Sequence, residues 1–454
     1  MSRYLVIAFI ILATAVVYSF SLPGQFHFDD YPLMLQNDRV TGDGMKLVDF
    51  PAQYGGRPLT LWSFRLNHLA GGERPWHFLL VNILLHLACV GLLTNLLWKA
   101  TEKPVLASMA GMIFALHPLQ TQAVNYIWSR SVLLMALFSL LALLLWRNRP
   151  AAAVAAYQLA MWSRVEAVLL IIPMLIWRKQ WKGLLVGMAV WNAAAAVYFF
   201  ARHQPAEFVW NHSDLLGYWS GQAIAFWKYA SLALIPIGQT IDHQDAAPGV
   251  WSVALGAAAL AASIGWAVKR RAAAAPAAHG ILWWVLFLSP SLLIPNPDFL
   301  NESRAYLAMA GLAAAGAFFL SRMAPRNAKT WVAAGVLLAV MSGLSIRRNQ
   351  LWNDDVALWQ EATMRSPQKG RAFYNYGVAL LREDRVQDAR GAFETAAGLD
   401  GDDDFSYAAL AFCAELEQDW EKALNLYQRA LQMNPQNEYA IRGYARLKQF
   451  ETDQ

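Results

Sequence analysis

Long runs of apolar residues, separated by short polar stretches, dominate the chain up to Trp352. Runs of about 17–25 apolar residues match the length of a helix that crosses the hydrocarbon core of a bilayer. The pattern therefore predicts an all-α fold: a polytopic membrane helical bundle of about eleven spans. One further apolar stretch, at 214–236, is interrupted by Lys228 and Pro236. We predict the eleven spans at 3–21, 77–98, 104–117, 132–147, 151–163, 165–177, 183–200, 250–268, 279–295, 304–321 and 330–346.

The part of the chain after Trp352 is polar and has the opposite charge balance. Residues 353–454 hold 18 acidic and 11 basic residues, a net charge of −7, whereas residues 1–352 hold 14 acidic and 26 basic residues, a net charge of +12. The whole chain is 57% hydrophobic and only 15% charged, against about 25% charged residues in soluble domains. We therefore predict a membrane domain at 1–352 and a soluble domain at 353–454.

Lysine and arginine are enriched in cytoplasmic loops, so the basic clusters orient the predicted spans. If the N-terminus with Arg3 is cytoplasmic, every cluster falls inside provided that 214–236 does not cross the membrane. We therefore interpret 214–236 as a re-entrant or interfacial segment on the outer side, which leaves the C-terminal domain outside the cytoplasm. The opening run, Tyr4 to Phe20, is interpreted as a retained anchor, because no small-residue cleavage site follows it. The clusters are Lys99/Lys103, Arg147/Arg149, Arg178/Lys179/Lys182, Lys269/Arg270/Arg271 and Arg322/Arg326/Lys329.

Several classes of chemistry lack their usual sequence signals. Two cysteines, Cys89 and Cys413, exclude a disulfide framework and a cysteine-rich metal site. The chain contains no GxxxxGK[ST], no GxGxxG after a strand and no HExxH. Nucleotide-binding and zinc-protease functions are therefore disfavoured, and we predict no nucleic-acid partner.

The soluble domain repeats every 34 residues. Trp359, Phe393 and Tyr427 keep this spacing, and so do Ala362, Ala396 and Ala430. The pattern resembles the tetratricopeptide repeat (TPR), in which small residues let paired helices approach closely. The resemblance implies two full repeats at 370–403 and 404–437, a half repeat before them and a closing helix near 438–450. Such arrays commonly bind peptides or partner proteins on their inner face; the alternative is a small cap on the membrane domain.

A series of motifs along the membrane domain resembles the GT-C superfamily of glycosyltransferases, which use lipid-phosphate sugar donors. With the repeats attached, the chain is most similar to the transmembrane-and-TPR O-mannosyltransferase family and its bacterial relatives. "SRVEA" (163–167) departs from the tighter Lys–Glu pair of those relatives, so Arg164 and Glu166 receive no role. The motifs are "FHFDD" (26–30), "GGRPLTLWSFRLNH" (55–68), "WHFLLVNILLH" (76–86), "HPLQTQAVNYIWSR" (117–130), "LIPIGQTIDH" (234–243) and "ESRAYL" (302–307).

The resemblance implies roles for particular residues. In GT-C enzymes an aspartate after the first span acts as catalytic base, since a carboxylate can accept the proton of an attacking hydroxyl. Relatives of this type use the first aspartate of the pair, which implies Asp29 as base and Asp30 in orienting the acceptor or the loop. The lipid-phosphate leaving group needs cations, and arginine binds phosphate through paired N–H donors. We predict Asp29 and Asp30 as catalytic residues, and Arg130 and Arg304, then Arg57, as phosphate ligands, with His117, His243 and Glu302 as further substrate-binding residues.

Each of these roles has a structural alternative. Two aspartates before Tyr31–Pro32 are also typical of a helix start. A lone histidine can be hydrogen-bonded to backbone, and an interfacial arginine can extend to lipid headgroups. A hard metal among Asp30, Asp242 and Glu302 is a further alternative, because some GT-C enzymes bind one. The O-mannosyltransferase-like members do not generally need it, so we predict no metal and no cofactor.

The resemblance and the charge pattern together predict an inverting membrane glycosyltransferase. It would transfer a sugar from a polyprenyl-phosphate donor to a protein hydroxyl that the TPR array recruits. Its short loops favour a multi-pass protein of the bacterial inner membrane, surrounded by membrane lipids, with its N-terminus cytoplasmic and its TPR domain periplasmic. One alternative is an enzyme of the same fold that glycosylates a lipid or a surface polysaccharide. Others are a non-enzymatic membrane-anchored TPR adaptor and, less favoured, a transporter, whose ionisable groups should lie near mid-bilayer.

Overall fold

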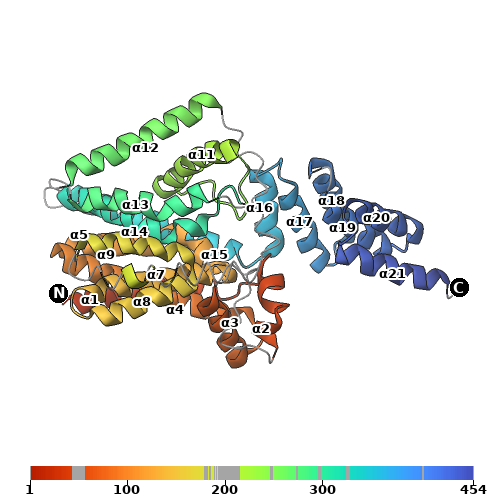
Figure 1. Cartoon of the computed structure of the whole chain (residues 1–454), viewed down its shortest axis with the longest axis horizontal. Coiled ribbons are helices and arrows are strands. Elements are labelled where there is room, and N and C mark those ends of the chain that lie inside the picture. Colours follow the sequence, from red (N-terminus) through yellow and green to blue (C-terminus); the bar gives the residue numbers. More distant parts are fainter. Residues whose placement is uncertain are drawn as a thin grey trace. The chain divides into compact units, whose positions relative to one another are not determined.

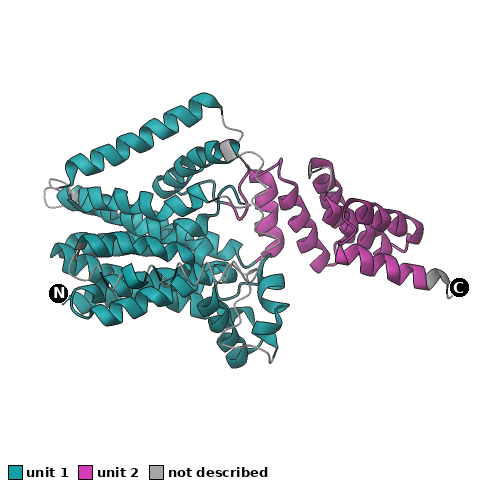
Figure 2. Cartoon of the chain, in the orientation of Figure 1, with its two compact units in different colours: residues 1–239, 246–353 teal, residues 240–245, 354–454 magenta. Residues whose placement is uncertain are grey.

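The computed structural model divides the chain into two compact units, each treated separately below (Figure 2). Unit 1 comprises residues 1–239 and 246–353, and unit 2 comprises residues 240–245 and 354–454. The division falls one residue after the predicted domain boundary, but it also assigns the six residues 240–245 to the C-terminal unit. The structure describes residues 2–42, 57–177, 183, 186–188, 190, 192, 215–245, 249–271, 275–294, 298–323, 328–400 and 403–452.

Unit 1 is a bundle of apolar helices, and its described residues contain no strand, which confirms the predicted all-α class (Figure 1). Six helices of the described part are long and apolar enough to cross a membrane, and three shorter apolar helices accompany them. The count of eleven spans stays a prediction, and most of the predicted span 183–200 lies outside the described residues. The principal helices are α1 (Arg3–Ser19), α3 (Pro58–Gly71), α4 (Pro75–Thr101), α5 (Pro104–Leu116), α7 (Arg130–Trp146), α8 (Pro150–Ser163), α9 (Ile171–Trp177), α11 (Leu215–Leu234), α12 (Val250–Arg270), α13 (Ala275–Leu293), α14 (Tyr306–Met323) and α15 (Ala328–Leu351).

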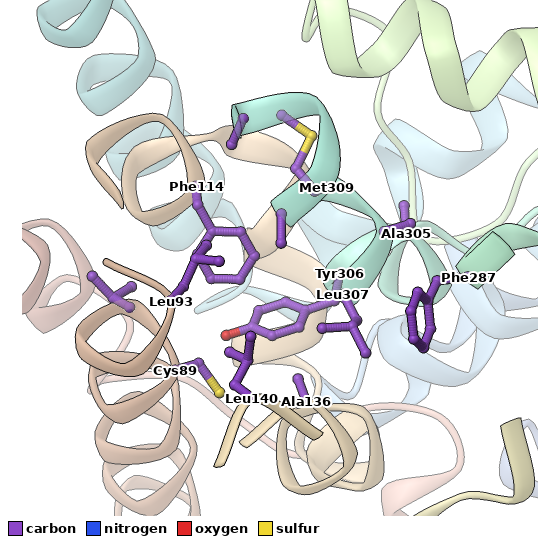
Figure 3. Packing of buried hydrophobic residues seen from close by; sticks show 14 of the residues in the cluster. Cys89, Leu93, Phe114, Ala136, Leu140, Phe287, Ala305, Tyr306, Leu307 and Met309 are labelled. Atoms are coloured by element: carbon purple, nitrogen blue, oxygen red, sulfur yellow. The ribbon is translucent and has the colours of Figure 1, made fainter. Parts of the chain in front are cut away.

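Small residues bring neighbouring helices of the bundle close together. A Cβ built on Gly280 of α13 would lie 2.3 Å from the carbonyl oxygen of Gly311 on α14, and the reverse distance is also 2.3 Å. Glycine is therefore the only residue that this crossing accepts without a backbone shift, as at many helix contacts in membranes. Further inside, the Tyr306 side chain lies among Cys89, Phe114 and other apolar groups (Figure 3). Its hydroxyl is 2.7 Å from Nδ1 of His86, which gives this buried polar group a partner.

Residues distant in sequence meet at one end of unit 1, which we call the loop end. It contains α2 (Asp38–Thr41) and the short helices that join the long ones: the π-helix η1 (Tyr31–Leu35), η3 (Pro118–Gln120), α6 (Thr121–Asn125), η4 (Ile127–Ser129), η5 (Val165–Leu170) and η7 (Glu302–Ala305). Hydrogen bonds connect these segments: the Gln239 side chain donates to the Pro118 carbonyl at 2.9 Å, and the Ser303 amide donates to the Gln122 side chain at 2.9 Å. The turn between α4 and α5, the turn between α7 and α8 and the C-terminal end of α12 lie at the opposite end of the bundle (Figure 1). By sequence, these segments carry Lys103, Arg149 and Arg270.

Helix α11 contacts the loop end near both of its own ends. Close to its N-terminus, the Tyr218 hydroxyl is 3.1 Å from the Ser291 carbonyl, at the C-terminal end of α13. Close to its C-terminus, the Ala233 carbonyl is 3.0 Å from Nε2 of His117. A helix that crossed the bundle would contact the loop end through one terminus alone. The interpretation of 214–236 as a re-entrant or interfacial segment stays a prediction.

The described residues of unit 2 form six helices in the order that the repeat predicts. Helix α17 packs on α18, α19 packs on α20, and α21 follows α20 as the closing helix. A Cβ on Gly377 would lie 2.6 Å from the Phe393 ring, which explains the small residue in this register. The helices are α16 (Asp355–Arg365), α17 (Gly370–Arg382), α18 (Val386–Asp400), α19 (Asp404–Leu416), α20 (Trp420–Met433) and α21 (Glu438–Thr452).

Candidate active site

The two aspartates after α1 have different environments. Asp30 is fully buried and its carboxylate accepts two backbone N–H groups, from His27 at 2.9 Å and from Trp128 at 2.7 Å. Burial raises the pKa of Asp30 to about 7, against the opposing effect of these hydrogen bonds. The carboxylate fastens the turn after α1 to the 126–130 segment. This geometry agrees with the predicted role of Asp30 in orienting the loop, and its predicted catalytic role stays a prediction. Asp30 is not the helix cap of the structural alternative, because it makes no side-chain cap bond.

Asp29 is half-buried at the loop end, next to Tyr126. Its backbone N–H donates to the Tyr126 hydroxyl at 3.2 Å. The environment of Asp29 is therefore partly open and partly fixed, which is what a base needs in order to meet an incoming hydroxyl in a defined direction.

Arg57 stands directly before α3 and is close enough to Asp29 for their charges to interact. Its guanidinium lies 5.9 Å from the centre of the Trp128 ring, and among the described residues no acceptor is within hydrogen-bond distance of it. Loss of hydration, together with a smaller effect of the positive charge of Arg164, lowers the pKa of Arg57 to about 9, so the side chain stays protonated near pH 7. The N-terminal amides of α3 add a dipole that favours an anion at the same place.

Four charged side chains surround Arg57 electrostatically: Asp29, Arg164, Glu166 and Arg304. We call these five residues the charged cluster. Arg164 is ion-paired with Glu166, and Arg304 is ion-paired with Asp298 at 3.3 Å. The sequence assigned no role to Arg164 and Glu166. The signal that could have found them is their position where α8 ends and η5 begins, which the predicted topology already placed on the same side as Asp29.

Arg130 is completely buried and saturated by neutral acceptors. Its Nε donates to Asn82 Oδ1 at 2.8 Å, and one Nη donates to Asn67 Oδ1 at 2.8 Å and to the Phe78 carbonyl at 2.9 Å. The other Nη donates to the Ser63 carbonyl at 3.2 Å. These contacts join α3, α4 and α7. The predicted phosphate contact is therefore disfavoured, and Arg130 is a connector of helices.

His117 and Glu302 also lie at the loop end, where protein groups already engage them. The Leu119 amide donates to Nδ1 of His117 at 3.1 Å, and Nε2 donates to the Ala233 carbonyl at 3.0 Å, so the neutral ring has both nitrogens satisfied. This is the backbone-bonded alternative foreseen for the histidine. Glu302 is buried and accepts a hydrogen bond from Gln239 at 2.8 Å. Neither residue is presented to a ligand in the way predicted.

His243 belongs to unit 2, together with Asp242. The Asp242 carboxylate accepts two hydrogen bonds from Arg371, at 2.6 Å and 2.7 Å, and lies 3.2 Å from the Lys369 ammonium. The Lys369 ammonium also donates to the His243 carbonyl at 3.0 Å. The segment 240–245 thus packs on the start of α17, and the substrate contact predicted for His243 has no support from its position.

A metal site among Asp30, Asp242 and Glu302 finds no counterpart in the described part of the chain. There, no group of three or more histidine, cysteine, aspartate or glutamate side chains is close enough to hold a metal ion. The prediction that the protein needs no metal stays a prediction.

Comparison with known proteins supports the predicted resemblance. A tetratricopeptide-repeat family model matches residues 405–437, which are α19, α20 and the residues that follow. The protein O-mannosyl-transferase tmtc2 of Xenopus laevis is 48% identical over 88 residues, covering 19% of this chain and 10% of that protein. Tmtc1 of Drosophila melanogaster is 38% identical over 149 residues, and TMTC4 of Mus musculus is 34% identical over 166 residues.

The aligned part is a small share of these relatives. The alignments cover 29% of this chain and 17% of the Drosophila protein, and 31% of this chain and 22% of the mouse protein. The comparisons confirm that the chain resembles the transmembrane-and-TPR O-mannosyltransferases, as the motifs predicted.

Proposed function

We propose that the protein is an inverting membrane glycosyltransferase that transfers a sugar from a polyprenyl-phosphate donor to a protein hydroxyl. The observation that carries this proposal is Arg57: a half-buried cation with no hydrogen-bond acceptor among the described residues, placed beside a half-buried carboxylate. A guanidinium that the described part of the chain leaves without an acceptor favours an anionic ligand, and a phosphate group fits its paired donors. Protein O-glycosylation is also the activity named for the relatives, and it is proposed here for this chain.

In the proposed reaction, the carboxylate of Asp29 and the guanidinium of Arg57 have different roles. Asp29 accepts the proton of the acceptor hydroxyl while the oxygen attacks the anomeric carbon, which inverts its configuration. The bond to the lipid phosphate breaks at the same time, and the departing phosphate carries the negative charge. Arg57 stabilises that charge, with Arg164 and Arg304 adding to the local positive potential. The carboxylates of Glu166 and Asp298 keep those two arginines in place.

The proposed orientation follows from the separation of charged groups in unit 1. The described basic turns lie at the end opposite to the charged cluster, and basic loops are typically cytoplasmic. The loop end then faces away from the cytoplasm, on the periplasmic side if the protein resides in a bacterial inner membrane. Unit 2 is proposed to hold the protein acceptor on that side, since TPR arrays bind peptides and proteins.

The proposal is tested with purified protein in proteoliposomes, a radiolabelled polyprenyl-phosphate sugar and candidate acceptor proteins. Asp29→Asn keeps the shape of the side chain and removes its basicity, so transfer should fall at least about 100-fold. Asp38→Asn is the matched control, because Asp38 is exposed in the same stretch of chain. Arg57→Gln should raise the KM for the lipid donor with little change in the KM for the acceptor.

The competing functions give different results in this assay. Transfer to lipid or polysaccharide but not to protein would identify an enzyme with another acceptor class. No transfer with any acceptor, together with protein capture by unit 2, would identify a membrane-anchored adaptor. Retention of more than about a tenth of the activity in Asp29→Asn would remove Asp29 as the base.

A further inference from the structure

The turn that presents Asp29 has an unusual backbone conformation. The Asp30 amide donates to the His27 carbonyl at 2.8 Å and closes the turn, and Phe28 at its second position has φ of 42°. Glycine is favoured where a turn requires positive φ, and a bulky residue there is an outlier. Such strain persists only when the surrounding structure fixes the backbone, and it is found mostly at functional sites.

Three contacts around the turn fix its backbone. The buried Asp30 carboxylate binds the amides of His27 and Trp128, as described above. The His27 ring donates from Nε2 to the Trp352 carbonyl at 2.9 Å. The third contact is the Tyr126 hydroxyl, which accepts the Asp29 N–H. The Tyr126 ring is 5% exposed and stacks on Trp352, with 6.0 Å between the ring centres and 28° between the planes, so the hydroxyl itself is held in place.

The hydroxyl of Tyr126 can also donate a hydrogen bond, and its contact with the Asp29 amide does not use that donor. A tyrosine oxygen accepts with its lone pairs and donates one O–H. Because the Asp29 N–H occupies a lone pair, the O–H remains available to a nearby carboxylate. Burial, and next to it the charges of Asp29 and Asp30, raise the pKa of Tyr126 well above its ordinary value. The phenol therefore stays protonated and acts as a neutral donor beside Asp29.

We propose that Tyr126 is the positioning residue of Asp29, holding its backbone through the amide and its carboxylate through the phenolic O–H. This rests on the proposed function, in which Asp29 is the base. The tyrosine would keep the carboxylate aimed at the acceptor hydroxyl. It would also weaken the carboxylate as a base, because a hydrogen bond to the charged form favours that form.

The test is Tyr126→Phe in the full-length protein, assayed for transfer across a range of pH. The variant keeps the ring and its stacking on Trp352 but removes the hydroxyl. We expect kcat to fall about 10- to 100-fold from misplacement of the base. The donor KM should stay unchanged, since Tyr126 does not touch the lipid phosphate in this proposal. The acid limb of the rate profile should move upward by about one pH unit, because a carboxylate that loses a donor is a stronger base.

Tyr157→Phe is the matched control. Tyr157 is also fully buried in unit 1, and its hydroxyl has no hydrogen-bond partner among the described residues. Removing that hydroxyl should change neither kcat nor the pH profile. If Tyr126→Phe lowered kcat without moving the acid limb, Tyr126 would support the fold alone and the proposal would be overturned. An unchanged kcat with an unchanged profile would overturn it as well.

A second measurement separates this proposal from the proposed function. The unfolding temperatures of Tyr126→Phe, Asp29→Asn and the double variant form a cycle that reports whether the two side chains interact. Non-additive shifts would support the contact even if no transferase activity were found, in which case the proposed function alone would fail. Additive shifts would overturn the proposed contact whatever the activity.

Discussion

Arg130 joins three helices of unit 1, and its replacement by lysine tests how much these contacts contribute to stability. Its side chain is completely buried and donates to four neutral acceptors, on Ser63, Asn67, Phe78 and Asn82. The informative change is Arg130→Lys, which keeps the positive charge. A lysine has a single nitrogen with three donors on a flexible stem, so it cannot reproduce a planar fork that reaches acceptors on separate helices.

The magnitude follows from the number of acceptors that lose their partner. We take at least two of the four to be left unsatisfied, and each costs about 1–3 kcal/mol when buried. Arg130→Lys should therefore lower the free energy of unfolding by about 2–6 kcal/mol. In a chain of this size the unfolding temperature should fall by about 5 °C or more.

The assay is thermal unfolding of the purified protein in detergent, with the donor KM measured on the folded fraction. Arg147→Lys is the control, since Arg147 is exposed at the opposite end of the bundle, and its effect should stay within about 0.5 kcal/mol. A raised donor KM with an unchanged unfolding temperature in Arg130→Lys would refute this reasoning. It would restore the phosphate contact that the sequence predicted.

Three further outcomes can be measured on the same protein. Asp242→Asn should destabilise unit 2 by about 3 kcal/mol, because Arg371 and Lys369 lose the negative charge of a largely buried carboxylate. Limited proteolysis of the C-terminal part should then be faster. Asp245→Asn is the control and should have little effect, because Asp245 is an exposed partner of Lys369. The free energy of unfolding of Phe28→Gly should exceed that of Phe28→Ala by about 1 kcal/mol, measured by thermal unfolding. Both variants lose the ring, but only alanine keeps the energetic penalty of positive φ. Equal stabilities would argue against strain in the turn. Burial raises the pKa of Asp30 to about 7, so the folded protein binds a proton at this carboxyl more tightly than the unfolded chain does. The stability of the wild-type protein should therefore decline as the pH rises from about 4 to about 7. Unfolding curves at several pH values should show that this decline is lost in Asp30→Asn.

The sequence predicted the features that depend on the order and spacing of residues along the chain. The 34-residue period placed the repeats at 370–403 and 404–437, and α17 to α20 fall within these limits because the period reports helix pairing directly. The interruption of 214–236 by Lys228 and Pro236 indicated that this segment differs from a simple span, and that interpretation stays a prediction. The order of the motifs predicted that Asp29, Arg57 and Arg304 lie in one region.

Other features depend on which polar groups meet in three dimensions. From its position in the sequence, Arg130 is expected to be a loop cation. Its hydrogen-bond donors are occupied because Asn67, Asn82 and Ser63 approach it from two other helices of the folded protein. Arg57 and Arg130 are both arginines beside aromatic rings, yet one is surrounded by acceptors and the other has none among the described residues. The sequence pattern does not distinguish the two arginines, because the hydrogen-bond partners of a side chain depend on which residues surround it in the folded protein.

The assignment of 240–245 to unit 2 has a consequence for synthesis of the protein. Asp242 and Arg371 are 129 residues apart, so the carboxylate leaves the ribosome long before its cation exists. At a translation rate of about 5–20 residues per second, the delay is on the order of ten seconds. During that interval the nascent loop must stay accessible until α17 has been made and delivered to the same compartment. A chain that terminates before Lys369 would lack both cations of this ion pair, so its Asp242 carboxylate would lose the two partners that hold the loop in the finished protein.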